Sequence, residues 1–192
     1  MTESLAKTSA LDPARQARLD RIRFFSVMLG RCCVALTALL TIALLLYWFM
    51  ASAASVATDA QIPPEWLANL GIGRRVAGFA ISFAPLACLI WALMAARRCF
   101  RAFVDGIFFS PEVTRNLRNC ALGLLASALL KPFSAAALSV LLTWNAPSGQ
   151  HRLTFGLGSD TMLALLAAGI IAVIAWVMAE ASALAEENAQ FV

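Results

Sequence analysis

Four long runs that are nearly free of acidic and basic residues constrain this chain more than any other feature. The runs cover 32–58, 76–96, 119–150 and 161–179, and Lys131 is the one charge inside them. A helix needs about 20 mostly apolar residues to cross a bilayer. Lipid tolerates only helices or closed barrels, and barrel strands alternate over about ten residues. The runs therefore predict an all-α polytopic membrane protein, a bundle of four transmembrane helices.

Composition agrees with a chain that lies mostly in lipid. Hydrophobic residues make up 61% of the 192 positions and charged residues 14%, against about 25% charged in soluble domains. This balance excludes a disordered protein and favours a single membrane domain over 1–192. The predicted parts are a tail over 1–25, spans at about 32–53, 76–97, 119–144 and 161–180, and loops over 54–75, 98–118 and 145–160.

The distribution of Lys and Arg predicts how the chain is threaded. Six of them precede the first span, up to Arg31, and five lie in 97–118, whereas the other two loops hold three. Loops rich in Lys and Arg stay in the cytoplasm. We therefore expect a multi-pass protein of a bacterial inner membrane with both termini and the loop over 98–118 in the cytoplasm, and with 54–75 and 145–160 outside.

A cleaved signal peptide is the alternative interpretation of the first run. Ala51, Ser52 and Ala53 resemble the small residues of a cleavage site. However, the charged region before the run is too long, and the run exceeds the usual apolar stretch of about 7–15 residues. We favour an uncleaved span.

Signals for metal, cofactor or enzyme chemistry are missing from the sequence. The five Cys show no C-x-x-C spacing and the chain has one His, His151, so we expect the thiols to pack as small apolar groups and predict no metal or cofactor. Neither a phosphate-binding loop nor an H-E-x-x-H motif occurs. The basic segment over 14–25 is short and adjoins the bilayer, so no direct nucleic-acid binding is expected. The chain is predicted to be a non-enzyme.

The loop over 98–118 contains a turn and a helix start. Gly106 permits a tight turn, and Phe109, with Phe108, is expected to anchor that turn at the membrane interface. Ser110 is followed by proline and glutamate, the typical order of an N-cap, a first helical residue and an acid in the first turn. A helix is therefore predicted to begin near Pro111.

Two further segments predict local structure. The alternation over 153–157 favours a short extended segment or hairpin, and Ser159 is a plausible N-cap for the last span. Beyond that span, Glu180 and Glu187 face the predicted cytoplasmic side. We expect one of them to pair with arginines of the middle loop or the tail, including Arg115 and Arg118.

Lys131 is the one charge within an apolar run, about 18 Å along the helix from Asn119 and thus close to mid-bilayer. The runs contain no acidic partner for it. The hydroxyls of Ser127 and Ser134 and the carbonyl freed by Pro132 are the expected partners, and Pro132 predicts a kink. An intramembrane lysine can indicate a functional site, but we favour a snorkelling side chain, because lysine is long enough to reach an interface or a wet cavity, and a Ser–Lys catalytic dyad has little support.

Two motifs resemble an uncharacterised bacterial family of four-span inner-membrane proteins, a domain of unknown function. The first covers 103–118, with Phe103, Gly106, two phenylalanines and Ser-Pro-Glu, then Arg115 and Arg118; the second is the ending from Met178 to Val192. The resemblance implies architecture rather than activity. Some members are similar in being encoded beside a small helix-turn-helix regulator, which implies such a regulator as a partner.

Two functions follow as hypotheses. The first is a membrane protein that senses or anchors a partner through its cytoplasmic motifs, with Glu187, Arg115 and Arg118 in contact with that partner. The second is a small transporter or channel, built as a homo-oligomer in the lipid bilayer, in which Lys131 lines the path.

Overall fold

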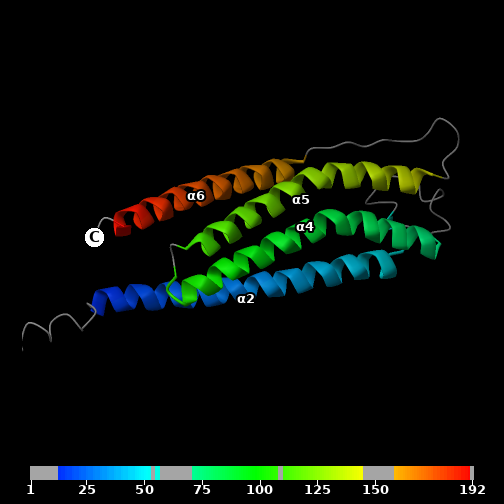
Figure 1. The fold of residues 1–192 in the computed structure, drawn as a ribbon. Coiled ribbons are helices and arrows are strands. Elements are labelled where there is room, and N and C mark those ends of the chain that lie inside the picture. The colour runs from blue at the N-terminus through cyan, green and yellow to red at the C-terminus, as the bar shows by residue number, and fades with distance from the viewer. Residues whose placement is uncertain (1–12, 53–54, 57–70, 108–109, 145–157, 191–192) are drawn as a thin grey trace, which may run out of the picture.

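Four helices make up the part of the chain that the computed structural model describes, namely residues 13–52, 55–56, 71–107, 110–144 and 158–190. In chain order these helices are α2 (Pro13–Met50), α4 (Ile72–Val104), α5 (Pro111–Thr143) and α6 (Ser159–Gln190) (Figure 1). No strand occurs in these residues. Each helix is long and apolar enough to cross a membrane. The prediction of an all-α protein with four membrane-spanning helices is confirmed.

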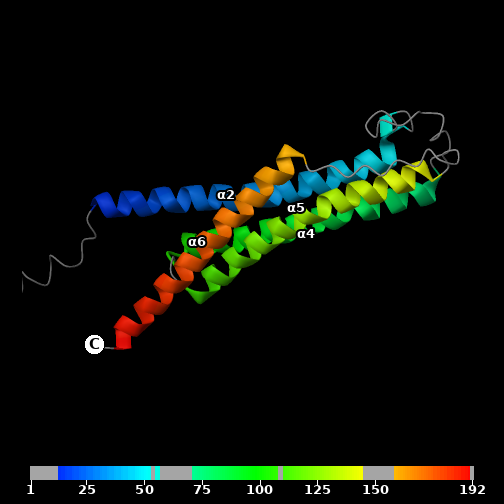
Figure 2. The same ribbon diagram turned by 90° about the horizontal axis from the view of Figure 1, so that it is seen from above.

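The four helices form a row in chain order. α2 packs on α4, α4 on α5 and α5 on α6, whereas the described parts of α2 and α6 do not contact each other. Figures 1 and 2 show the row from two directions, with α6 crossing obliquely over α5. The two outermost helices therefore leave wide faces uncovered by protein, and large apolar side chains such as Leu39 and Trp176 are exposed there. Such faces suit a lipid environment.

All four helices are longer than a bilayer requires. α2 has 38 residues, α4 and α5 have 33 each and α6 has 32, which correspond to about 48–57 Å of helix, against about 30 Å of hydrocarbon. α2 begins at Pro13, so the basic segment expected near the membrane surface is continuous with the first span. The hairpin expected over 153–157 lies outside the described residues.

Small residues bring neighbouring helices close together. A Cβ atom on Gly123 of α5 would lie 2.8 Å from Ala92 Cβ and 2.9 Å from the Cys88 carbonyl oxygen of α4. Ala92, Ala95 and Cys120 form a buried cluster at this crossing. The α2–α4 crossing works in the same way, because the ring of Trp48 fills the space that a side chain at residue 78, a glycine, would need.

Both central helices contain a proline and are bent. Pro132 is buried inside α5, and Pro85 lies inside α4. Figure 1 shows α4 and α5 each curving near the middle. A proline removes one backbone donor and crowds the preceding turn, so the bend in α5 agrees with the predicted kink.

Candidate functional site

The turn between α4 and α5 is closed by a regular helix-ending motif. Gly106 has a φ of +77°, in the left-handed region that glycine adopts without steric cost. Its N–H donates to the Phe103 carbonyl at 3.2 Å, and the Ile107 N–H donates to the Ala102 carbonyl at 2.9 Å. These are the two bonds of a Schellman motif. The turn predicted at Gly106 is confirmed.

The start of α5 is equally well defined. The Ser110 hydroxyl accepts a hydrogen bond from the Val113 N–H at 3.2 Å, Pro111 is the first helical residue and Glu112 lies in the first turn. The Cys99 thiol of α4 donates to the Val113 carbonyl at 3.6 Å across the turn. The predicted helix start is confirmed, and its first turn is held against α4. Phe109, which was expected to anchor the turn, lies outside the described residues.

Removing the Ser110 cap should loosen this turn. We expect Ser110→Ala to destabilise the purified protein by about 1 kcal/mol, because the Val113 N–H loses its acceptor. Ser110→Asp, which keeps an acceptor oxygen, should restore most of that loss. Thermal unfolding in detergent checks both variants, and an equal loss in the two would contradict the capping role.

Arginines gather at the end of the row that contains this turn, which we call the basic end. They include Arg23 and Arg31 on α2, Arg97, Arg98 and Arg101 on α4, and Arg115 and Arg118 on α5. Figure 1 shows that α2 begins and α6 ends at this end of the row. The predicted gathering of positive charge beside both terminal helix ends therefore appears in the structure.

The ion pair expected between the last helix and these arginines is not present in the described residues. Glu180 is exposed and forms no ion pair, and the one salt bridge of the described chain lies elsewhere. The side chain of Glu187 lies outside the described residues. Since α6 contacts only α5, Glu180 stays away from α2 and α4. Arg115 and Arg118 are exposed as well.

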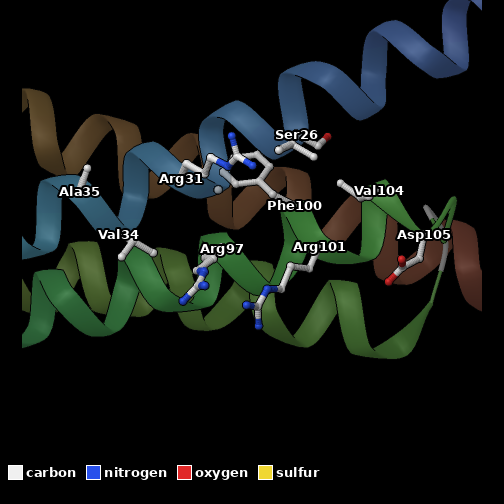
Figure 3. Close-up of a pocket in the computed structure, with 11 residues that line it drawn as sticks. Ser26, Arg31, Val34, Ala35, Arg97, Phe100, Arg101, Val104 and Asp105 are labelled. Carbon is white, nitrogen blue, oxygen red and sulfur yellow. The ribbon is translucent and has the colours of Figure 1, made fainter.

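A groove between α2 and α4 at the basic end is the feature that sequence reasoning missed. Its cavity volume is about 700 Å³, and Arg31, Arg97 and Arg101 line it. Figure 3 shows Arg97 and Arg101 one turn apart on α4, with side chains that extend away from α2 in this view, and Arg31 of α2 beside the ring of Phe100. The spacing of four residues between Arg97 and Arg101 is a sequence signal for one helix face, but it does not reveal which helix lies opposite.

Two other arginines have a structural task in the same helix pair. Arg23 of α2 donates from Nε to the Val104 carbonyl at the end of α4, at 3.1 Å. At the opposite end, Arg75 of α4 donates to carbonyls at the end of α2, including Trp48 at 2.9 Å and Ala51 at 3.1 Å. The last carbonyls of a helix have no hydrogen-bond donor within it. An arginine of each helix therefore supplies a donor to carbonyls at the C-terminal end of the other helix.

The structure corrects the expectation that Lys131 has no acidic partner. Its ammonium donates to the Asp160 carboxylate at the start of α6, and the two form a salt bridge. Ser127 and Ser134, the expected partners, are half-buried and give Lys131 no hydrogen bond in the described structure. Asp160 directly precedes the fourth apolar run, so an acidic partner sought only within the runs could not be found.

The salt bridge also defines where α6 begins. Asp160 is in the first turn of α6, and Lys131 is in the middle of α5. The residue before the helix is Gly158, whose carbonyl accepts from Thr161 at 3.0 Å, so Ser159 is the first helical residue rather than the predicted N-cap. Along α5, Lys131 lies about 24 Å from Arg115 of the basic end. This distance is slightly less than the hydrocarbon thickness of a bilayer, which is about 30 Å.

The cysteines offer no metal centre in the described structure. All five are free thiols, and Cys33, Cys99 and Cys120 are buried on three different helices. No group of three or more His, Cys, Asp or Glu side chains that could hold a metal ion occurs among the described residues. Cys120 packs against Ala92 and Ala95, as expected of a small apolar group.

Comparison with known proteins identifies a family. The family model described as "Protein of unknown function (DUF2975)" matches residues 45–192. No curated protein and no solved structure matches the chain. The match includes the α4–α5 turn and the whole of α6.

Proposed function

This chain belongs to the family of proteins of unknown function DUF2975, and we propose that it is a non-enzymatic membrane protein that docks a soluble protein at its basic end. The proposed docking surface consists of the α4–α5 turn, with Gly106 and Ser110, and the exposed Arg115 and Arg118. We also propose that this end lies in the cytoplasm and that the membrane is the bacterial inner membrane, since loops rich in Lys and Arg stay inside.

The observation that carries the proposal is a turn with hydrogen bonds at both ends that lies beside exposed charges. The Schellman bonds at Gly106 and the Ser110 cap hold the turn at both ends. Arg115 and Arg118 follow within the first turns of α5 and form no ion pair with described residues. A positive surface held in a defined shape favours an acidic protein partner, because complementary charge steers association. The family resemblance points to a helix-turn-helix regulator as that partner.

Crosslinking in living cells tests the proposal. A photoreactive residue at Arg115 should give a discrete adduct with a soluble protein, and the same residue at Trp144 should not. Trp144 is a matched control because it is exposed and follows the opposite end of the same helix. Adding Arg118→Glu should weaken the Arg115 adduct through charge repulsion. The proposal fails if Arg115 crosslinks only to its own chain or if both positions give the same adducts.

A second candidate function is a small oligomeric transporter or channel. The observation that favours it is the exposure of the Lys131–Asp160 salt bridge, whose side chains are 56% and 63% accessible. The pair lies on the surface of α5 and α6, so a path along it needs a second copy to enclose it. In vesicles that contain the purified protein, Lys131→Met should then abolish the flux of the transported species across the membrane. An unchanged flux would exclude this function.

A further inference from the structure

The groove between α2 and α4 combines positive charge with an apolar wall. Besides Arg31, Arg97 and Arg101, its lining includes Val27, Val34 and Phe100. Asp105, which follows the last residue of α4, is the one acidic side chain of the lining. Three arginines against one aspartate leave the groove positive.

These three arginines differ from the others of the helix pair. Arg23 and Arg75 donate to backbone carbonyls at the helix ends. In the described structure, Arg31, Arg97 and Arg101 form neither a hydrogen bond nor an ion pair. A guanidinium presents five donors in a planar fork that matches phosphate oxygens. Three such groups around one cavity indicate a site for a phosphate group.

The position of the groove specifies the rest of the ligand. On α2 the lining runs from Ser26 to Ala35, and the first apolar run begins at residue 32. Ser26 is only 6% exposed and adds a hydroxyl near the polar end. Towards the centre of the helix row the arginines give way to Val34 and Ala35. The ligand should therefore carry a phosphate at one end and a hydrocarbon chain at the other.

We propose that this groove binds an anionic phospholipid. The headgroup phosphate lies against Arg31, Arg97 and Arg101, and an acyl chain follows Val34 and Ala35 into the membrane. Basic pockets between transmembrane helices suit acidic headgroups in this way. Gly30 faces Phe100 across the groove, and a Cβ built on it would make an ordinary van der Waals contact of 3.9 Å with Phe100 Cβ. The bound lipid would hold α2 against α4 at the basic end.

Native mass spectrometry of the full chain in detergent tests this site with dioleoyl-phosphatidylglycerol as the probe. The wild type should bind it more tightly than dioleoyl-phosphatidylcholine. Arg97→Gln should weaken binding about fivefold, the effect of one arginine near an acidic lipid. Arg98→Gln is the matched control, because Arg98 is the next residue, is exposed and does not line the groove. Glycerol 3-phosphate, which has the phosphate without the chains, should bind far more weakly.

Several results would overturn the proposal. They are equal binding of the two lipids, equal loss in Arg97→Gln and Arg98→Gln, or tight binding of glycerol 3-phosphate. A photoreactive phosphatidylglycerol on the wild type needs no variant and covers the case in which Arg97→Gln does not fold. Its adducts should map to 26–35 and 97–105, and adducts confined to α5 and α6 would reject the site. The test uses purified protein without a soluble partner, so it is independent of the proposed docking function.

Discussion

Gly123→Leu should separate α4 from α5 and produce the largest loss of stability among the variants considered. A Cβ at this position already lies 2.8 Å from Ala92 Cβ, 2.9 Å from the Cys88 carbonyl oxygen and 3.0 Å from the Ala92 nitrogen. Two of these three atoms belong to the backbone, so no rotamer change relieves the contact. Overpacking typically costs about 1–3 kcal/mol, and we expect roughly 3 kcal/mol or more for a leucine here.

A thiol-reactive dye provides the measurement, because Cys33, Cys99 and Cys120 are buried in the folded chain and react on unfolding. Gly169→Leu on α6 is the control, since a Cβ at Gly169 meets nothing within 4 Å. The dye should react at a clearly lower temperature in Gly123→Leu and at nearly the wild-type temperature in Gly169→Leu. Equal shifts would show that the α4–α5 crossing tolerates a side chain.

Charge reversal at Lys131 should be the second large effect. Lys131→Glu places two carboxylates where the structure has a salt bridge, and like charges at close range repel each other. We expect this variant to accumulate poorly in membranes and to unfold several degrees below the wild type. Lys131→Met should lose less stability than Lys131→Glu, because it leaves Asp160 unpaired without adding a second negative charge.

The exchange Lys131→Asp with Asp160→Lys separates pairing from any other role of the lysine. It should recover much of the stability lost in Lys131→Glu, but not all of it, because a positive charge at the N-terminus of α6 opposes the helix dipole. Ser127→Ala and Ser134→Ala are the controls, since neither serine bonds Lys131 in the described structure. If the exchanged pair is no more stable than Lys131→Glu, the salt bridge does not hold α6 in place.

Local patterns were sufficient for the features that depend on neighbours in the chain. The apolar runs predicted four membrane-spanning helices because lipid leaves the backbone no other partners. The turn at Gly106 and the cap at Ser110 were predictable because their hydrogen bonds close within a few residues. The helix bounds were harder. The arginine spacing over 14–25 predicts a helix, but only the structure shows that this helix begins at Pro13 and continues without a break into the first span.

The sequence by itself thus determined the number and nature of the helices and the ends that join α4 to α5. Tertiary structure alone decided which of their side chains meet. Asp160 reaches Lys131 only because α6 starts beside the middle of α5. Glu180 has no ionic partner among the described residues, although α6 packs on α5, the helix that carries Arg115 and Arg118. The arginine groove likewise needs α2 opposite Arg97 and Arg101. The pattern of apolar residues shows which face of a helix is buried. Which helix packs on that face, and in which register, depends on steric fit, here at glycines and alanines that allow two helices to approach closely.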